Sequence, residues 1–167
     1  MMNYQICESP LGSILLVSDG RALKRLDFID DPEQSGLTAD DHQHIDCVID
    51  GVIEETMLQL QEWFAGQREV FDLPVSPDGT GFQHTVWDQL LKIPFGETRT
   101  YGEVAQSINK PTAARAVGAA NGKNPIALII PCHRVNGANG ALTGYTFGIE
   151  RKKQLLELES HAKSMQP

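Results

Sequence analysis

Residues 126–135 read IALIIPCHRV, an apolar run that leads directly into a cysteine, a histidine and an arginine. The run Ile126–Pro131 is the longest apolar one in the chain and predicts a buried strand that ends beside Cys132. Because adjacent strand residues point to opposite faces, His133 reaches the Cys132 thiol only if the chain leaves the strand at Pro131 or a water lies between them. A free thiol, with a pKa of about 8.5, is mostly protonated at neutral pH. Cys132 is therefore a candidate nucleophile that needs activation, and the alternative is an unreactive core cysteine.

The residues before this stretch predict two short helices around a tight turn. The first helix spans 101–108, the second spans 112–121, and residues 109–111 form the turn. Two helices joined in this way are typical of a helix-turn-helix motif. Alanines give the second helix a slim face, which allows close approach to another backbone, either a protein neighbour or DNA.

The N-terminal part predicts a small antiparallel sheet followed by a helix. Short strands separated by Pro-Leu-Gly and Asp-Gly turn signals are expected at 4–7, 13–18 and 22–28. Residues 30–43 are polar and predict a surface loop, whereas apolar residues recur at helical spacing over 49–64. The Pro- and Gly-rich stretch 71–81 predicts a connection between domains, with a helix at 82–91 after it. We therefore expect an α+β domain at 1–78 and a mostly helical domain at 79–167.

The distribution of charge differs sharply between the two halves of the chain. Residues 1–90 carry four basic and seventeen acidic side chains, a balance of −13, whereas residues 91–167 carry ten basic and five acidic ones, a balance of +5. This asymmetry indicates a C-terminal part that binds a polyanion, although acidic surface loops alone also account for the first half. Among the 167 residues, three cysteines argue against a disulfide framework, and no apolar run is long enough for a bilayer. With no secretory signal at the N-terminus, we expect a cytoplasmic protein.

Five segments in order give the chain a family resemblance. They are TYGEVA at 100–105, RAVGAA at 115–120, PCHRV at 131–135, LTGY at 142–145 and LLELE at 155–159. Together they resemble the O6-alkylguanine-DNA alkyltransferases, also called methylated-DNA–protein-cysteine methyltransferases. The resemblance is strong over about residues 80–160, and earlier it is limited to SPLG at 9–12. It implies an N-terminal ribonuclease-H-like antiparallel-sheet domain and a C-terminal domain that carries the helix-turn-helix and the active-site cysteine.

The resemblance also implies the reaction, a direct and irreversible transfer of the alkyl group from O6 of guanine in duplex DNA to Cys132. His133 then acts as base through a bound water, and Glu159 orients its imidazole. Asn124 fixes the loop of Cys132, and the Tyr101 hydroxyl hydrogen-bonds a ring nitrogen of the departing guanine. No cofactor is needed.

Further residues are implied to bind the base and the DNA. The carbonyls of Cys132 and Val135 accept from the guanine amine, the Thr146 backbone faces the guanine oxygen, and Tyr145 lines the pocket. Flipping the nucleotide out of the duplex costs a few kcal/mol, and Arg115 offsets part of this cost by filling the space that is left. The expected DNA-contacting residues are Lys110, Thr112, Arg115, Ala116, Lys123, Arg134 and the Arg151–Lys153 cluster.

Two residues depart from the family pattern near the expected site. Asn121 stands where some relatives have an apolar residue, and Phe147 stands where many have glycine. A Phe147 ring on the pocket rim is expected to slow the entry of a benzyl group, unless the ring folds back onto the following helix.

Two other functions are compatible with the sequence. A helix-turn-helix protein that binds lesions or regulates transcription needs no nucleophile, and a Cys-His-Glu hydrolase acts on esters rather than on DNA. Cys7, His42, His44, Cys47 and His84 are possible metal ligands, but no pair has zinc-knuckle spacing, so we expect no metal. We expect a monomer whose partner is double-stranded DNA containing O6-alkylguanine, with no role at a membrane.

Overall fold

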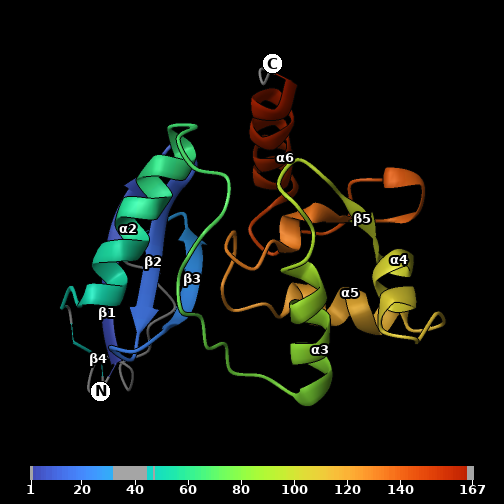
Figure 1. Cartoon of the computed structure of the whole chain (residues 1–167), viewed down its shortest axis with the longest axis horizontal. Helices are drawn as coiled ribbons and strands as arrows, with labels where there is room; N and C mark the ends of the chain where they lie inside the picture. Colours follow the sequence, from blue (N-terminus) through green and yellow to red (C-terminus); the bar gives the residue numbers. More distant parts are fainter. Residues whose placement is uncertain (1, 32–44, 47, 165–167) are drawn as a thin grey trace. The chain divides into compact units, whose positions relative to one another are not determined.

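The computed structural model describes residues 2–31, 45–46 and 48–164. The chain divides into two compact units, Met1–Asp78 and Gly79–Pro167, which Figure 1 shows in blue to green and in green to red. Within the described ranges, none of the helices is both long enough and apolar enough to cross a bilayer.

The first unit is built on a four-stranded sheet of order β3-β2-β1-β4. Strands β1 (Met2–Ser9), β2 (Gly12–Ser18) and β3 (Leu23–Ile29) form the predicted antiparallel meander, which is confirmed. A short strand, β4 (Ile45–Asp46), pairs in parallel with the start of β1. β4 could not be predicted from the sequence, because a two-residue strand carries no periodicity.

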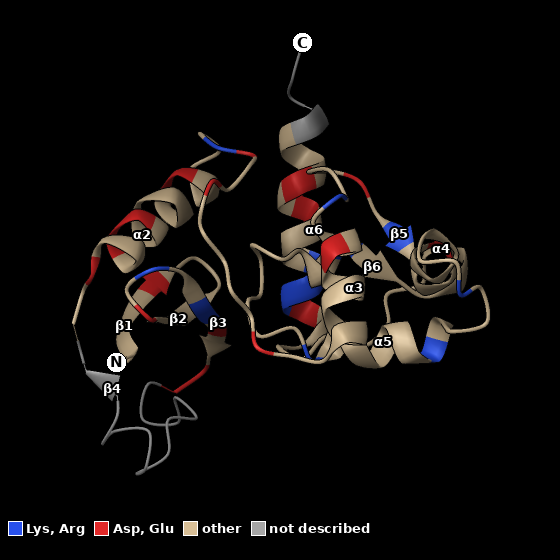
Figure 2. Ribbon diagram, turned by 60° about the horizontal axis from the view of Figure 1, so that its bottom comes forward, with Lys and Arg blue, Asp and Glu red and all other residues tan. Residues whose placement is uncertain are grey.

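Helix α2 (Gly51–Phe64) packs on this sheet and is tied to it at its N-terminus. The Asp50 carboxylate caps the helix by accepting from the Ile53 N–H at 2.9 Å. Its other oxygen accepts from Ser18 Oγ at 2.6 Å and from Asn3 Nδ2 at 2.8 Å, so one side chain joins two strands to the helix. The helix carries three acidic residues and no basic one, and Figure 2 shows its surface marked only in red.

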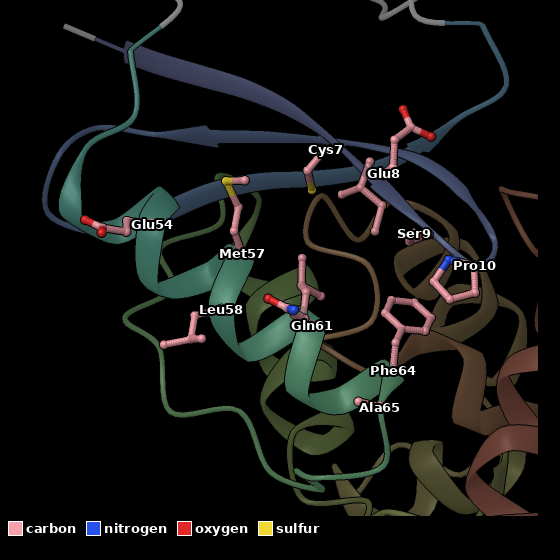
Figure 3. A pocket seen from close by; sticks show the side chains of 12 residues that line it. Cys7, Glu8, Ser9, Pro10, Glu54, Met57, Leu58, Gln61, Phe64 and Ala65 are labelled. Atoms are coloured by element: carbon pink, nitrogen blue, oxygen red, sulfur yellow. The ribbon is translucent and has the colours of Figure 1, made fainter.

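A groove of about 830 Å³ opens between α2 and the end of β1 (Figure 3). Its lining is mainly apolar and includes Met57 and Phe64. Glu8 and Glu54 also line it, but Figure 3 shows the Glu8 carboxylate on the side of the strand that faces away from α2. Burial raises the pKa of the Cys7 thiol in this groove, and the negative charge of Glu8 raises it further. The residues predicted for the site all lie in the other unit.

The second unit consists of four helices with short connecting elements. Its elements are α3 (Gly81–Leu90), β5 (Arg99–Thr100), α4 (Tyr101–Ser107), α5 (Ala114–Gly122), a 3-10 turn η2 (Cys132–Arg134), β6 (Val135–Asn136), a second 3-10 turn η3 (Ala138–Gly140) and α6 (Ile149–Ser164). Trp87 on α3 is buried and donates its indole N–H to the Ala120 carbonyl at 2.9 Å, which holds α3 against α5. β5 and β6 pair in parallel, which places Thr100, the residue before Tyr101, opposite Asn136.

Helices α4 and α5 form the two helices predicted around a tight turn. Thr100 and Glu103 form a capping box at the start of α4, as the Thr-x-x-Glu spacing favours. The turn contains Asn109 with a φ of 59°, a left-handed conformation that asparagine tolerates better than most residues. α5 starts at Ala114, two residues later than predicted.

The predicted strand at 126–130 is wrong, because this segment forms a turn. The Ile130 N–H donates to the Ile126 carbonyl, and Leu128 has a φ of 68°. Asn124 satisfies further backbone groups, since its Oδ1 accepts from the Ile126 N–H and its Nδ2 donates to the Ile130 carbonyl at 2.7 Å. A buried apolar run therefore does not need a neighbouring strand here, and the chain enters η2 directly at Cys132.

Candidate active site

Cys132 lies at the base of a pocket of about 330 Å³ in the C-terminal unit. The pocket is lined by α4, α5 and the loop before α6, through Tyr101, Gly118, Asn121, Gly122, Cys132, Gly144, Tyr145 and Thr146. Cys132 itself is only 5% exposed, so a reacting group must enter the pocket to reach the thiol. Of the residues predicted for the site, Tyr101, Cys132, Tyr145 and Thr146 are brought together here.

Next to the pocket, Glu159 of α6 binds the two residues that follow Cys132. One Glu159 oxygen lies 2.7 Å from Nε2 of His133. The Arg134 guanidinium donates to the same carboxylate through Nε and Nη2, at 2.7–3.0 Å. Its Nη1 donates to the Ile93 carbonyl at 2.8 Å. All three side chains are buried, so this is a dry hydrogen-bonded network rather than a surface ion pair.

The network keeps Glu159 charged and His133 neutral. Burial lowers the pKa of His133 below its ordinary value of 6.5, and the hydrogen bond that His133 donates to Glu159 offsets this only in part. For Glu159, burial alone raises the pKa, but the hydrogen bonds and charges of His133 and Arg134 outweigh it and bring the pKa below 4.5. A neutral imidazole can accept a proton, which is what a general base requires.

The Cys132 thiol is protonated at neutral pH in this environment. Burial raises its pKa, while the Asn124 amide and the Lys152 ammonium oppose the rise without cancelling it. The Nδ1 atom of His133 is buried with no hydrogen-bond partner among the described residues. It is thus a free position at which an imidazole can take up a proton.

Tyr145 and Lys152 add two further polar groups close to the thiol. Burial raises the pKa of Tyr145 well above 10, and the neighbouring Cys132 adds to this shift. Lys152 is fully buried, and its ammonium donates to the carbonyls of Val135 at 2.6 Å and of Thr143 at 2.9 Å. It therefore joins α6 to the segments on both sides of the pocket.

Only some of the predicted base-binding residues line the pocket. Thr146 lines the pocket, and its hydroxyl donates to the Gly122 carbonyl at 3.0 Å. Val135 is fully buried outside the lining, and its carbonyl already accepts from Lys152. Phe147 is absent from the lining, and its ring packs edge-to-face against that of the lining residue Tyr145, at 5.7 Å between ring centres. The gate at the pocket rim therefore stays a prediction.

Most of the predicted DNA-contacting residues lie on the surface of this unit. Lys110, Thr112, Arg115, Ala116 and Lys123 are exposed on or beside α5, and Lys110 also lies over the Phe82 ring. Figure 2 shows blue at the start of α5. The prediction that Arg134 contacts phosphate is wrong, because its guanidinium is buried and bound to Glu159 and Ile93. Lys152 of the expected Arg151–Lys153 cluster is likewise buried, with its ammonium on two carbonyls.

Sequence reasoning missed the roles of Lys152 and Asn121 in the structure. Lys152, Leu155 and Glu159 recur at helical spacing and form the buried face of α6, so periodicity was a usable signal for Lys152. Asn121 was noted only as a departure from the family pattern, yet its Nδ2 donates to the Cys132 carbonyl at 3.3 Å. No pattern in the sequence indicates that Asn121 contacts Cys132.

Asn124 and the candidate metal ligands are the remaining residues named from the sequence. Asn124 holds the turn before Cys132 through three hydrogen bonds to the backbone of Ile126 and Ile130. Among the described residues, no group of three or more His, Cys, Asp or Glu side chains could hold a metal ion. His42, His44 and Cys47 lie outside the described ranges.

Both units match family descriptions. Residues 2–77 match "6-O-methylguanine DNA methyltransferase, ribonuclease-like domain", and residues 81–161 match "6-O-methylguanine DNA methyltransferase, DNA binding domain". The chain is 49% identical over 160 residues to a methylated-DNA–protein-cysteine methyltransferase of Methanosarcina barkeri, covering 96% of this chain and 98% of the archaeal one. A protein of the same name from Mycobacterium bovis is 46% identical over 162 residues, covering 95% and 93% of the two chains.

Solved structures agree with these matches. The O6-methylguanine methyltransferase of Mycobacterium tuberculosis superposes with a TM-score of 0.86 at 46% identity, covering 100% of this chain and 96% of that one. A second crystal structure from this organism, of OGT in complex with DNA, gives a TM-score of 0.85 at 45% identity, over 96% and 94% of the chains.

The buried neutral state of His133 predicts a loss of stability in mild acid. Since folding lowers its pKa, the unfolded chain binds a proton below pH 6.5 that the folded protein does not bind. The free energy of unfolding is expected to fall with decreasing pH from about 6.5, at up to about 1.4 kcal/mol per pH unit, until the folded pKa is reached. Glu159 adds a second decline in the free energy of unfolding below about pH 4.5. Its pKa is also lower in the folded protein, so the unfolded chain again binds more protons. Urea unfolding between about pH 7 and about pH 4 measures both.

Two substitutions test the assignment of the first decline. His133→Asn is expected to remove the part that begins near pH 6.5, whereas His161→Asn, at an exposed position of α6, leaves it in place. An unchanged pH dependence in His133→Asn contradicts the assignment.

Removing Arg134 is expected to be costly because it leaves Glu159 buried beside a single neutral partner. Arg134→Met should lower the free energy of unfolding by about 3–5 kcal/mol, the usual cost of breaking a buried pair. Arg99→Met is the matched control, since its pair with Glu97 is 40% exposed on both sides and is expected to contribute about 0–1 kcal/mol. Equal effects of the two substitutions, measured by chemical denaturation, disagree with the buried network.

Proposed function

The chain belongs to the 6-O-methylguanine DNA methyltransferase family, and we propose that it repairs duplex DNA by moving an alkyl group from O6 of guanine to Cys132. The observation that carries this proposal is a pocket lined by Cys132, whose next residue, His133, is hydrogen-bonded to the buried Glu159. The matches to methylated-DNA–protein-cysteine methyltransferases over nearly the whole chain support the same reaction.

The transfer forms one bond and breaks one. The Cys132 sulfur attacks the alkyl carbon, and the bond from that carbon to the guanine oxygen breaks. The thiol proton passes through a water to Nδ1 of His133, the buried nitrogen for which the described part of the chain offers no hydrogen-bond partner. The Tyr101 hydroxyl, on the pocket wall, donates to a ring nitrogen of the guanine as negative charge develops there. Overall, the thiol proton replaces the alkyl group on the base.

The pKa shifts indicate when the proton moves. A thiol whose pKa is raised by burial and an imidazole whose pKa is lowered by burial are both neutral at rest. Proton transfer between them is unfavourable on its own, so it accompanies attack on the alkyl carbon. Glu159 then stabilises the imidazolium that forms, as the carboxylate of a catalytic triad does.

Access to the alkyl group requires the guanine to leave the base stack. Cys132 is only 5% exposed, so a base that remains paired inside the duplex cannot reach its thiol, and flipping costs a few kcal/mol. Arg115 is exposed on the first turn of α5 and is suited to fill the vacated space, while Lys110 and Lys123 contact phosphates. These contacts carry no sequence readout, which suits repair in any context. We take the protein to act as a monomer in the cytoplasm.

A protein that only binds lesions is the alternative. Such a protein has no use for a thiol beside a base, and its Cys132 is replaceable without loss of function. The buried Cys132–His133–Glu159 arrangement favours chemistry instead.

The product of the transfer predicts a single turnover. A thioether has no carbonyl for water to attack, so each molecule gains one alkyl group on Cys132 and stops. Intact-protein and peptide mass spectrometry after incubation with an O6-methylguanine duplex is expected to show one methyl per chain, on Cys132. Cys132→Ala should bind the duplex without transfer. More repaired base than protein, or a methyl on Cys7, contradicts the proposal.

Substitution of Arg115 separates base flipping from chemistry. Arg115→Ala should slow repair of duplex DNA by about tenfold or more, while reaction with a free alkylguanine base, which needs no flipping, changes little. Arg115→Lys keeps the charge without the planar guanidinium and is expected to recover only part of the rate. Arg21→Ala, an exposed arginine of the other unit, serves as control. An equal loss on both substrates assigns Arg115 to the structure of the site instead.

A further inference from the structure

Asn121 is a buried polar residue on the wall of the active-site pocket. It lies near the C-terminal end of α5, is 5% exposed, and lines the pocket together with Tyr101, Cys132 and Tyr145. No step of the transfer described above uses it. Its amide Nδ2 donates to the carbonyl oxygen of Cys132 at 3.3 Å.

That contact fixes which way the amide faces. If the amide were turned over, its Oδ1 would face the Cys132 carbonyl, and two acceptor oxygens would meet. The donor end is therefore held at Cys132, and the remaining atom is an acceptor. Asn121 Oδ1 is buried and has no hydrogen-bond partner among the described residues. A buried acceptor without a donor is unfavourable, so any ligand that brings a donor gains from meeting it.

The substrate class brings one such donor. In O6-alkylguanine, alkylation of the oxygen leaves N1 without a hydrogen, and the exocyclic 2-amino group is then the only donor on the pairing edge of the base. The resemblance already places this amino group at the Cys132 carbonyl, which is the group that Asn121 contacts. The amino group carries two hydrogens. The second acceptor that the resemblance implies, the Val135 carbonyl, lies outside the pocket lining and already accepts from Lys152, so the second hydrogen is available to Asn121.

We propose that Asn121 is a specificity-determining residue whose Oδ1 accepts a hydrogen bond from the 2-amino group of the flipped alkylguanine. The inference rests on the proposed function and adds to it the feature of the base that is recognised. Because Oδ1 is shielded from solvent in this structure, the proposed contact requires the pocket wall to shift slightly as the base enters.

The consequence is discrimination between alkylated bases. O6-alkylhypoxanthine lacks the 2-amino group and leaves Oδ1 unpaired. O4-alkylthymine presents an unprotonated ring nitrogen and a carbonyl oxygen on the same edge, and it has no donor there. Both bases are expected to react more slowly than O6-alkylguanine, and part of that difference depends on Asn121.

The test compares two duplexes that differ only in the 2-amino group, one with O6-methylguanine and one with O6-methylhypoxanthine. Single-turnover transfer rates are measured for the wild-type protein, Asn121→Leu and Asn121→Ala. The ratio of the two rates is expected to fall by about three- to tenfold in both variants, the range for loss of one hydrogen bond. Asn136→Leu is the matched control, because Asn136 is equally buried with an unpaired Oδ1 but does not line the pocket, and its ratio should stay as in the wild type.

The outcomes separate the inference from the function on which it rests. If both Asn121 variants slow the two substrates equally, Asn121 only supports the Cys132 carbonyl and the inference is overturned. If Asn121→Leu does not fold, Asn121→Ala decides alone. Absence of methyl transfer by the wild-type protein to either duplex overturns the proposed function, and this inference falls with it.

Discussion

The carboxylate of Glu159 accepts hydrogen bonds from the side chains of two consecutive residues, His133 and Arg134. A buried carboxylate must be paired, and its two partners, Arg134 and His133, have different roles. Arg134 supplies the positive charge that keeps the carboxylate ionised, and this leaves His133 free to stay neutral. The 3-10 turn that begins at Cys132 is thereby held against α6 at two successive positions. The thiol, the base and its orienting carboxylate all depend on this one contact.

The basic residues of the C-terminal unit serve two separate purposes. Arg134 and Lys152 are buried, and their charges hold α6 to the active-site segment and to the pocket wall. Arg115 and Lys123 are exposed on or beside α5 and are available to DNA. The positive balance of this half is therefore only partly a measure of its affinity for a polyanion. Substitutions of the buried residues should lower stability, whereas substitutions of the exposed residues should lower the affinity for DNA.

Much of the fold was readable from the sequence, and the exceptions share a physical cause. The meander and the helices were predicted because their apolar residues recur with the period of the element they form. The segment before Cys132 was misread as a strand, since an apolar run shows that a segment is buried but not how its backbone is satisfied. There, the Asn124 side chain and the left-handed Leu128 replace a neighbouring strand. Arg134 and Lys152 were misplaced because a charged residue is normally on the surface, and only the position of its partner reveals that it is buried.

In the proposed reaction, Cys132 and His133 are both neutral in the resting protein, and the proton moves only as the alkyl group is attacked. A direct test is NMR titration of the protein labelled with carbon-13 at cysteine Cβ and nitrogen-15 at histidine, with Cys132→Ser and His133→Asn used to assign the signals. We expect the Cys132 signal to report a thiol through neutral pH and to titrate only in the alkaline range, while the His133 ring stays neutral down to below pH 6.5. A Cys132 thiolate paired with a protonated His133 at neutral pH would contradict it.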